Sequence, residues 1–393
     1  MSVRSVAVVG AGAAGLVAAA FAAAAGAPVT LIERTRDGGR KILISGGGRC
    51  NVLPSVLAPE RFVTDSPAHL LRGMLRAWPL HEQRAFFEHE LGIPLALEQE
   101  SGKLFPQSDR ARDVRDGLVE FAKAKGVELR FDTTVTGLSA SLSGFSLETS
   151  TGAIECARVI LATGGLSVPA TGSDGTGLEI ARTLGHHLND TYPALTPLLD
   201  GGGRHAALSG VSLSVRLRSK SWETHGGFLF THRGYSGPSV LDISHVTERG
   251  DAVIRAQWAT LTAEELIGKD EFVSSILSRK MPARLAEQLT RECGIPADRR
   301  TSSLKRAERN ALVEAVTSYE LPWSGNEGYK KAEVTGGGVA LTEVDPKTLE
   351  SRKVKGLYLC GEMLDAFGPI GGHNFSWAWS TGRAAGMAAG KFA

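Results

Sequence analysis

The segment Val6-Ala-Val-Val-Gly10-Ala-Gly12-Ala-Ala-Gly15 decides the fold of this chain, together with the apolar run at residues 28–34 that follows it. A short apolar run, a G-x-G-x-x-G turn, an alanine-rich stretch and a second apolar run ending in an acid predict a β-α-β unit. In such a unit the first glycine allows a tight turn, the second lets the backbone approach a pyrophosphate, and the third lets the helix pack on the strand. The segment therefore predicts a dinucleotide site in which the phosphates face the N-terminus of the helix.

Glu33, at the end of the second apolar run, stands where an acid accepts hydrogen bonds from ribose hydroxyls. A G-x-G-x-x-G pattern alone is weak, because a chain rich in glycine and alanine produces chance matches. The agreement of strand, helix, second strand and acid favours the dinucleotide site. The alternative is a β-α turn that tolerates glycine and binds no ligand.

The chain has 393 residues, of which 42% are hydrophobic and 22% are charged, with a net charge of +2. These values are typical of a soluble globular protein of two or three domains, and they indicate no strongly charged partner such as DNA. The four cysteines lie far apart without a C-x-x-C pattern, which argues against a disulfide framework, a zinc site or a dithiol centre. Because we find no secretory signal and no apolar run of membrane length, we expect a cytoplasmic protein that binds no membrane.

A second glycine cluster, Ser45-Gly-Gly-Gly-Arg-Cys-Asn51, follows the β-α-β unit. Three consecutive glycines disfavour a regular helix or strand, so we expect a loop with exposed backbone N–H groups. Arg40, Lys41 and Arg49 add positive charge, and the combination suits a pyrophosphate or the electron-rich edge of a ring. A flexible linker is the alternative, although linkers rarely carry two flanking basic clusters without an acid.

Later segments lead to the same crevice, because ligands of doubly wound sheets lie beyond the carboxyl ends of the strands. One buried strand is expected to end in Ala162-Thr-Gly-Gly165, and a later one in Gly361-Glu362. The turn Gly371-Gly-His373-Asn374 runs directly into a C-terminal helix, whose positive N-terminal end would point to the crevice. A strand near residues 127–131 leads to a small-residue loop at Val135, which we expect beside an adenine ring.

The hydrophobic pattern changes in the middle of the chain, where strict apolar–polar alternation is followed by helical spacing. We therefore expect an α/β fold in which a Rossmann-like domain is split into residues 1–190 and 335–393. The insertion, residues 191–334, would comprise a β-rich part at about 191–260 and a helical part at about 261–320.

The arrangement of the glycine loops favours FAD over NAD as the resident cofactor, because FAD is long and needs contacts from both ends of the chain. NAD-dependent dehydrogenases usually devote their second half to a substrate domain with its own catalytic His or Lys. We find no second G-x-G-x-x-G in the chain. Either NAD(P)H visits the flavin without a dedicated domain, or the substrate itself reduces the flavin.

Four segments make a family resemblance specific: Gly46-Gly-Gly-Arg-Cys-Asn51, the run from Phe228 to Pro238, Thr335-Gly-Gly-Gly-Val339, and the stretch from Gly361 to Asn374. Over nearly its whole length the chain resembles the YhiN/BaiN-like family of bacterial NAD(P)/FAD-dependent oxidoreductases, also called the aminoacetone oxidase family. The resemblance implies an FAD domain split by an insertion that contains a β-barrel and a helical part. In relatives the last glycine turn commonly reads Gly-Gly-Tyr-Asn, whereas this chain has His373.

The residue patterns and the resemblance together give one set of expected FAD-binding residues. This set draws on the first glycine turn, the acid after it, the basic and glycine-rich loop, and the ends of the later strands. Its members are Gly10, Gly12, Ala13, Ala14, Gly15, Glu33, Arg34, Arg40, Lys41, Ser45, Gly46, Gly47, Gly48, Arg49, Cys50, Asn51, Val135, Ala162, Thr163, Gly164, Gly165, Gly361, Glu362, Gly371, Gly372, Asn374 and Phe375.

A flavin enzyme of this kind also needs a proton donor. The candidates for catalysis are His373, Cys50 and His232, and Tyr235 is a further candidate donor. The glycine neighbours of His373 favour a placement facing the ligand, and a purely structural role is its alternative. Cys50 has no second cysteine near it in the sequence, which favours a packing or backbone role, and the alternative for His232 is a turn or interface residue.

Three functions are compatible with these features. The one we favour is an NAD(P)H-dependent reductase of a C=C bond in an unknown substrate. For the substrate, the resemblance implies unsaturated small molecules, or uridine in ribosomal RNA, as for a ribosomal RNA dihydrouridine synthase. The second is a flavin oxidase of small amines, and the third is a flavin-bearing binding protein without enzymatic activity.

A basic stretch bears on the choice of substrate. Nine basic residues lie between residues 279 and 309, against four acids. Such a stretch either follows RNA phosphates or is a solvated helix face, and the second explanation is the commoner one. We therefore expect a small-molecule substrate rather than RNA. The nine residues are Arg279, Lys280, Arg284, Arg291, Arg299, Arg300, Lys305, Arg306 and Arg309.

Overall fold

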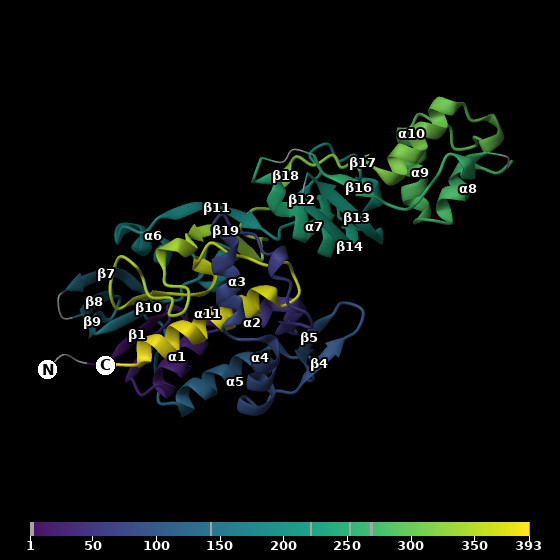
Figure 1. The fold of residues 1–393 in the computed structure, drawn as a ribbon. Coiled ribbons are helices and arrows are strands. Elements are labelled where there is room, and N and C mark those ends of the chain that lie inside the picture. Colours follow the sequence, from purple (N-terminus) through teal and green to yellow (C-terminus); the bar gives the residue numbers. More distant parts are fainter. Residues whose placement is uncertain (1–3, 142–143, 221, 251–252, 268–269, 393) are drawn as a thin grey trace. The chain divides into compact units, whose positions relative to one another are not determined.

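A computed structural model describes residues 4–141, 144–220, 222–250, 253–267 and 270–392 of the protein (Figure 1). The chain forms two compact units: unit 1 comprises Met1–Tyr192 and Val334–Ala393, and unit 2 comprises Pro193–Glu333. Each unit has its own hydrophobic core. Within the described residues, we find no helix with both the length and the hydrophobicity of a membrane span.

A five-stranded parallel sheet forms the core of unit 1, with the strand order β20-β10-β1-β2-β6. Its middle strand β1 (Val6–Val9) is buried along its whole length, as expected for a parallel sheet covered on both faces. Val8 pairs in register with Ile160 on one side and with Leu31 on the other. The predicted Rossmann-type α/β fold is confirmed. The other strands are β2 (Val29–Ile32), β6 (Glu128–Arg130), β10 (Arg158–Leu161) and β20 (Leu357–Leu359).

The helices α1 (Ala13–Ala24) and α11 (His373–Gly390) lie side by side in unit 1 (Figure 1). Three glycines of α11, spaced four residues apart, face the backbone of three alanines of α1. A Cβ atom on any of them would come within 2.3 to 2.4 Å of an α1 carbonyl oxygen, so only glycine allows this approach. The facing pairs, which we call the glycine seam, are Gly382 with Ala14, Gly386 with Ala18, and Gly390 with Ala22.

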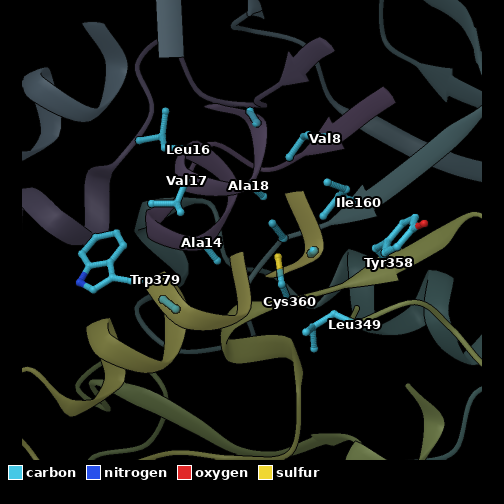
Figure 2. Close-up of a cluster of buried hydrophobic side chains, with 14 of the residues drawn as sticks. Val8, Ala14, Leu16, Val17, Ala18, Ile160, Leu349, Tyr358, Cys360 and Trp379 are labelled. Atoms are coloured by element: carbon cyan, nitrogen blue, oxygen red, sulfur yellow. The ribbon is translucent and has the colours of Figure 1, made fainter. Parts of the chain in front are cut away.

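Figure 2 shows part of the unit 1 core, where α1 meets the strands and α11. Leu16 of α1, Ile160 of β10 and Trp379 of α11 are each 0% exposed. Cys360, which directly follows β20, is also 0% exposed, so its thiol belongs to the packed core. This core fixes the carboxyl ends of the parallel strands against the start of α1.

Smaller elements complete unit 1. Two three-stranded antiparallel sheets have the orders β3-β5-β4 and β7-β8-β9, and β11 pairs with β19, so the glycine-rich run at 335–339 is a buried strand. The helices are α2 (Arg40–Ile44), α3 (Ala68–Arg76), α4 (Leu80–Ala85), α5 (Ala111–Ala124) and α6 (Thr176–Thr183). The strands are β3 (Leu53–Pro54), β4 (Leu95–Glu98), β5 (Lys103–Pro106), β7 (Val135–Ser141), β8 (Gly144–Thr149), β9 (Gly152–Cys156), β11 (Leu188–Ala194) and β19 (Val334–Val339).

Unit 2 contains a seven-stranded sheet whose neighbouring strands run antiparallel, in the order β17-β16-β13-β14-β15-β12-β18. Along β13 the side chains of Val215 and Leu217 are buried while Arg216 and Arg218 between and beyond them are exposed, which is the alternation that the sequence predicted. The strands are β12 (Leu198–Leu199), β13 (Ser212–Ser219), β14 (Trp222–Phe230), β15 (Gly234–Ser236), β16 (Arg255–Gln257), β17 (Tyr319–Glu320) and β18 (Gly325–Asn326).

The β-barrel expected at about residues 191–260 is not confirmed. In the described part of unit 2, the sheet runs from β17 at one edge to β18 at the other, and no pairing of these two strands closes it. Both edge strands come from beyond residue 318, outside the predicted range. Alternation identifies strands locally, but closure depends on the pairing of the first and last strands, which no local pattern contains.

The helices of unit 2 form two groups. The helix α7 packs against β14, β13 and β15, and three further helices follow between residues 273 and 317. Both groups contribute to one hydrophobic core, which includes Phe228 of β14 and Leu285 of α9. The helices are α7 (Pro238–Ile243), α8 (Val273–Ser278), α9 (Ala283–Glu292) and α10 (Arg306–Thr317).

Candidate functional site

The three glycines of the first turn have different surroundings. Gly10 has a φ of +100°, and a Cβ atom there would lie 2.6 Å from the carbonyl oxygen of Ala162. A Cβ atom at Gly15 would lie 1.8 Å from the carbonyl oxygen of Gly10. At Gly12 a Cβ atom would meet nothing within 4 Å. Gly10 and Gly15 are therefore required by packing, whereas Gly12 borders open space.

The open space at Gly12 lies at the N-terminus of α1. Gly12 is the N-cap, no side chain caps this end of the helix, and its first turn contains no acid. The first N–H groups of a helix have no intrahelical partner, and the helix dipole makes this end positive. The backbone N–H groups of Gly12, Ala13 and Ala14 can therefore bind an anion such as a pyrophosphate.

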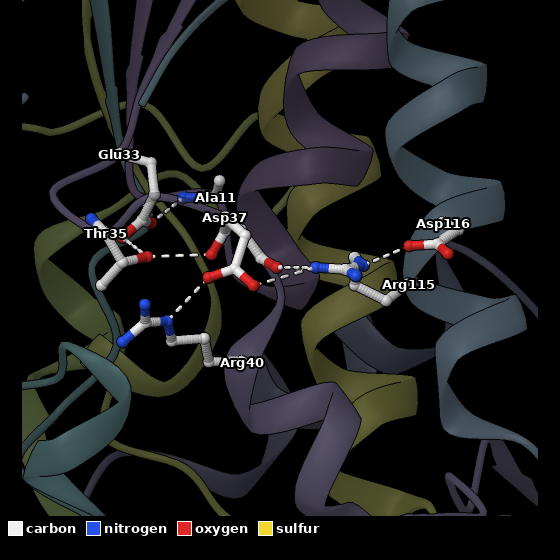
Figure 3. A network of polar contacts seen from close by, with 8 residues as sticks. Ala11, Glu33, Thr35, Asp37, Arg40, Arg115 and Asp116 are labelled. Atoms are coloured by element: carbon white, nitrogen blue, oxygen red, sulfur yellow. Dashed lines mark hydrogen bonds and ion pairs between the residues drawn. The ribbon is translucent and has the colours of Figure 1, made fainter. Parts of the chain in front are cut away.

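Glu33 binds the backbone of this turn (Figure 3). Its Oε2 accepts a hydrogen bond of 2.8 Å from the N–H of Ala11, and its Oε1 accepts bonds from the N–H and the hydroxyl of Thr35 at 2.9 and 2.7 Å. The hydroxyl of Thr35 also donates to the carbonyl oxygen of Asp37. The N–H of Thr133 donates to the carbonyl oxygen of Glu33, which brings the segment before Val135 beside this acid.

A second part of this network supports the segment that leads to α2 (Figure 3). Asp37 accepts a hydrogen bond of 2.9 Å from Nε of Arg40 and lies 3.5 Å from Nη1 of Arg115, and these cations hold the pKa of its carboxyl below the usual value although burial opposes the shift. The guanidinium of Arg115, which is 8% exposed, also donates to the carbonyl oxygen of Gly38. A helix that is distant in sequence therefore anchors the loop after Glu33.

The four basic residues expected near the phosphates are each paired with an acid. The sequence therefore identified the cations but not their partners. Their charge is largely neutralised within the chain, which leaves the N–H groups of α1 as the main positive element facing a pyrophosphate. The pairs are Arg34 with Asp174, Arg40 with Asp37 at 2.9 Å, Lys41 with Glu362 at 2.7 Å, and Arg49 with Glu98 at 3.0 Å and Asp109 at 2.9 Å.

The second glycine cluster forms a tight turn after the short helix α2. Gly46, Gly47 and Gly48 have φ values of +55°, +68° and +88°, which glycine adopts without strain. The hydroxyl of Ser45 donates to the carbonyl oxygen of Ile42 at 2.7 Å. The guanidinium of Arg49 lies 3.9 Å from the ring centre of Phe105 and is paired with Glu98 and Asp109. These contacts hold the side chain in place, so it is not free to bind a phosphate.

Two loops meet at the first glycine turn. The loop after β10 reaches it through Ala162, whose carbonyl oxygen lies against Gly10, and through the backbone of Thr163. The loop after β20 reaches it at Gly361, where a Cβ atom would come within 2.8 Å of the Cβ of Ala14. The side chain of Thr163 packs against Gly177 of α6, whereas its Cα lies against Gly10 of the turn. Gly164 lies beside Ser173, and Gly165 lies beside Thr335.

Lys41 and Glu362 meet in a cluster to which two further residues contribute. Nζ of Lys41 donates to Oγ of Ser167 and to Oε2 of Glu362, both at 2.7 Å. Oε1 of Glu362 accepts bonds from the hydroxyl of Ser167 and from the N–H of Thr335. The hydroxyl of Thr335 accepts from the N–H of Leu166 and of Ser167. The cluster therefore ties together the segments after β2, β10 and β20.

The C-terminal turn precedes α11, whose first turn contains no acid. A Cβ atom at Gly372 would come within 2.5 Å of the backbone of Leu53, and one at Gly371 would lie 3.5 Å from Lys103 and 4.0 Å from Nδ2 of Asn51. Asn374 organises the turn itself, because its side chain exchanges two hydrogen bonds of 2.9 Å with the backbone of Gly368.

Phe375, Cys50 and His373 are set in packed surroundings. Phe375 stacks on Trp379 with 5.2 Å between the ring centres. The thiol of Cys50 is 0% exposed, and burial raises its pKa to about 12. His373 is 6% exposed, and burial together with the nearby Arg61 lowers its pKa to about 4. At neutral pH both candidate donors are uncharged.

The remaining candidate donors belong to unit 2. His232 is exposed on the turn between β14 and β15. Tyr235 is 0% exposed, and burial raises the pKa of its hydroxyl. That hydroxyl lies 2.9 Å from Nδ1 of His205, whose Nε2 lies 3.1 Å from both Glu292 and the hydroxyl of Tyr319. Tyr235 is thus one member of a buried polar network.

The basic stretch of unit 2 is largely paired within the chain. Arg284 and Arg309 donate to backbone carbonyl oxygens, and Arg291 donates to Gln288. These pairings favour a stabilising role for most of the stretch over a row of cations facing phosphates. The ion pairs are Arg279 with Glu271, Lys280 with Glu265, Arg299 with Glu308, and Arg300 with Asp270.

Sequence reasoning missed several residues that organise the site in unit 1 or the core of unit 2. Ser167 lies two positions after the identified Gly165 and belongs to no motif, whereas Thr335 begins an identified glycine motif but had no predicted role. Gly386 and the other glycines of the seam had a readable signal, because small residues every four positions on two helices indicate close helix packing. His205 had none, since its partners come from distant parts of unit 2. Within the described residues, we find no cluster of three or more His, Cys, Asp or Glu side chains that could hold a metal ion.

The residues of unit 1 fit a bound flavin dinucleotide. The space at Gly12 suits a pyrophosphate, as described above. Near the C-terminal turn, Asn51 and His373 are buried and keep polar atoms without a hydrogen-bonding partner among the described residues: Oδ1 of Asn51 and both ring nitrogens of His373. Buried polar atoms without hydrogen bonds lower the stability of a fold. A bound ligand rich in hydrogen-bonding groups would supply the missing partners.

Comparison with known proteins agrees with this geometry. The family profile described as "HI0933-like protein Rossmann domain" matches residues 4–388. The chain is 34% identical over 388 residues to the "Ribosomal RNA dihydrouridine synthase" of Escherichia coli (strain K12), covering 95% of each chain. It is 32% identical over 410 residues to the "3-dehydro-bile acid delta(4,6)-reductase" of Clostridium scindens, covering 98% of each chain.

Solved structures show the same fold at low sequence identity. The 3-ketosteroid delta1-dehydrogenase from Sterolibacterium denitrificans has a TM-score of 0.55 at 12% identity, covering 98% of this chain and 99% of that one. A flavocytochrome c3 fumarate reductase has a TM-score of 0.52 at 18% identity, covering 98% of this chain and 78% of that one. From its match to the family profile and to full-length relatives, the chain belongs to the HI0933-like family, the YhiN/BaiN-like flavoproteins that its motifs predicted, and is an FAD-dependent oxidoreductase.

Proposed function

We propose that this flavoprotein reduces a carbon–carbon double bond of a small molecule, with NADH or NADPH as the electron donor. The observation that carries the proposal is the chemistry shared by its two relatives. One is named as a delta(4,6)-reductase of a 3-dehydro bile acid, and the other as a synthase of dihydrouridine, the form of uridine with two added hydrogens. Both names describe the addition of hydrogen across a C=C bond, although the substrates differ in size and charge.

The FAD-binding role belongs, in this proposal, to residues 1–190 and 335–393, with residues 191–334 as an inserted domain. Gly12 and the first N–H groups of α1 would hold the pyrophosphate. Glu33 would bind a ribose, since its Oε2 accepts one hydrogen bond in the fold and can accept another. The loop from Ser45 to Asn51 and the turn before α11 would border the flavin ring.

When bound, FAD supplies hydride transfer. The first turn of α11 contains no acid, so its N–H groups would stabilise negative charge on the reduced ring. Three side chains remain candidates for the accompanying proton: His373, Cys50 and His232. The first two are buried and neutral at pH 7, whereas His232 is exposed on a turn of unit 2.

An anaerobic absorbance titration tests the proposal. Purified protein loaded with FAD is titrated with NADH and then with NADPH, and candidate substrates follow. We expect one nicotinamide to bleach the flavin and an unsaturated carbonyl compound to restore its colour. Bleaching by small amines with no response to either nicotinamide would favour an amine oxidase. A colourless protein that cannot be loaded with FAD would overturn the proposal.

The same titration separates a small-molecule substrate from RNA. Ribosomal RNA lacking the modification is added to the reduced enzyme in place of the small molecule. We expect no return of flavin colour, because most basic residues of the stretch at 279–309 are paired within unit 2. Reoxidation by RNA that is lost on charge reversal of Lys305 and Arg306 would instead support a dihydrouridine synthase.

A further inference from the structure

The ring of His373 is buried, and the surrounding residues do not satisfy the hydrogen bonding of its two nitrogens. The residue is 6% exposed, and among the described residues neither Nδ1 nor Nε2 makes a hydrogen bond of good geometry, although a contact with the backbone of Ile370 favours the protonated ring. Nearly all buried polar groups of native proteins are hydrogen-bonded, so each exception calls for a cause. A buried histidine without hydrogen bonds destabilises the protein unless another group supplies them.

The imidazole is nevertheless held in one place. Its ring meets the edge of Phe62, with 6.0 Å between the ring centres. A Cβ atom at Gly368 would come within 2.6 Å of the Cβ of His373, so the backbone closes over this side chain. Phe62 also packs against Trp377, one turn further along α11. The unsatisfied nitrogens therefore belong to an oriented ring.

His373 lies where two expected flavin-binding loops approach one another. It is the first residue of the 18-residue helix α11, directly after Gly371 and Gly372. Gly371 lies near Nδ2 of Asn51 from the second glycine cluster. Asn51 is 9% exposed, and its Oδ1 also lacks a partner among the described residues. Two buried side chains with unsatisfied atoms thus come from the two loops that meet at Gly371.

We propose that His373 contacts the flavin ring of bound FAD as a neutral imidazole, and that this contact supplies the hydrogen bonding that the protein leaves open. The inference rests on the proposed function, because it requires FAD at this site. A neutral imidazole offers one donor and one acceptor, which suits the alternating carbonyl and N–H groups of a flavin edge. The lowered pKa of His373, about 4, keeps the ring neutral at pH 7. His373 therefore binds and tunes the flavin and does not serve as an imidazolium proton donor.

Two substitutions separate this role from a purely structural one. His373→Phe keeps an aromatic ring beside Phe62 but removes both nitrogens, and His373→Gln keeps a neutral donor and acceptor. Replacing a buried unsatisfied polar group by an apolar one of similar shape is neutral or stabilising. We therefore expect the His373→Phe apoprotein to melt at or above the wild-type temperature, although it binds FAD about tenfold more weakly.

The Gln variant and a control complete the test. We expect His373→Gln to recover most of the FAD affinity. His81→Phe, which removes an exposed imidazole from α4 of the same unit, should change neither property. The inference is overturned if the Phe variant binds FAD with wild-type affinity, or if it loses stability and FAD affinity together. A wild-type protein that binds no FAD would instead defeat the proposed function.

Nitrogen NMR gives a readout that does not depend on activity. With ¹⁵N-labelled histidine, the ring signals of His373 are assigned by their loss in His373→Phe. We expect these signals to report a neutral ring at pH 7 and to shift when FAD is added, while the signals of His81 stay in place. Unchanged His373 signals in the FAD-loaded protein would contradict the contact.

Discussion

Lys41 and Glu362, which are 321 positions apart in the sequence, form an ion pair of 2.7 Å between Nζ and Oε2. Their side chains are 26% and 18% exposed, so the pair is shielded from water more than a surface pair is. Because it joins segments from the two ends of unit 1, its removal affects the packing of both.

We expect Lys41→Met and Glu362→Gln to be coupled. In a double-mutant cycle on the apoprotein, measured by urea unfolding, the coupling free energy should be about 1 kcal/mol. Arg40 is the matched control, because this neighbour pairs with Asp37 instead. The cycle of Arg40→Met with Glu362→Gln should give a coupling near zero. Equal coupling in both cycles would show that the ion pair is not the cause.

The glycine seam should tolerate no side chain. Gly386→Ala places a Cβ atom 2.3 Å from the carbonyl oxygen of Ala18, so we expect the free energy of unfolding to fall by about 2–4 kcal/mol as α11 shifts away from α1. Gly73→Ala is the control, because Gly73 lies within α3 and a Cβ atom there would meet nothing within 4 Å. That change should stabilise the protein by about 0.5–1 kcal/mol. Thermal or urea unfolding measures the change in the free energy of unfolding for each variant. Equal changes at the two glycines would contradict the close packing of α11 on α1.

Gly12 and Gly10 should respond differently to alanine. Gly12 has a φ of −75° and open space at its Cβ position, so Gly12→Ala meets no steric conflict and should lower the free energy of unfolding of the apoprotein by only about 0.5–1 kcal/mol, through the loss of a favourable N-cap residue. The added methyl group would occupy the space assigned to the pyrophosphate, and we expect the FAD affinity, measured by fluorescence titration, to fall at least about tenfold.

Gly10→Ala should destabilise the apoprotein itself, because Gly10 has a φ of +100° and its Cβ would meet the backbone at Ala162. If Gly12→Ala bound FAD with wild-type affinity, the phosphates would not lie at Gly12.

The stability of unit 2 should depend on Glu292 in acid. Burial alone would raise the pKa of Glu292, but hydrogen bonds from His205, Gln288 and Tyr319 outweigh it and lower the pKa to about 2. The unfolded chain has the ordinary value of 4.5 and so binds more protons between these two pH values. The stabilisation is complete above pH 4.5 and is lost as the pH falls towards 2, by up to roughly 3 kcal/mol.

Urea unfolding at pH 7, 5 and 3 measures this effect as a difference between variants. Glu292→Gln should unfold more easily than the wild type at pH 7, and the difference should shrink at pH 3. Glu287→Gln, an exposed change on the same helix, should differ little from the wild type at any pH. A difference for Glu292→Gln that does not change with pH would argue against an ionised carboxylate in this network.

The local parts of the fold could be predicted from the sequence, because their signals lie within single elements. The β-α-β unit at Gly10 to Glu33 follows from hydrophobic periodicity and from glycine conformations. The partners of Lys41 and Arg49 could not be predicted, since they are set by chain segments that meet only after folding. For the same reason alternation could identify strands in unit 2, whereas the described strands do not form the closed barrel that the family resemblance implied.

The glycine seam also has a consequence for how the protein is made. The strand β20 and the helix α11 are synthesised after residue 356, yet they pack on elements made much earlier, β10 (Arg158–Leu161) and α1 (Ala13–Ala24). Until the ribosome has passed Gly390, the alanine face of α1 has no partner helix and the parallel sheet lacks an edge strand. We expect ribosome-bound chains that stop before α11 to remain protease-sensitive in unit 1. Binding of FAD would then report that α11 has been synthesised and has packed on α1.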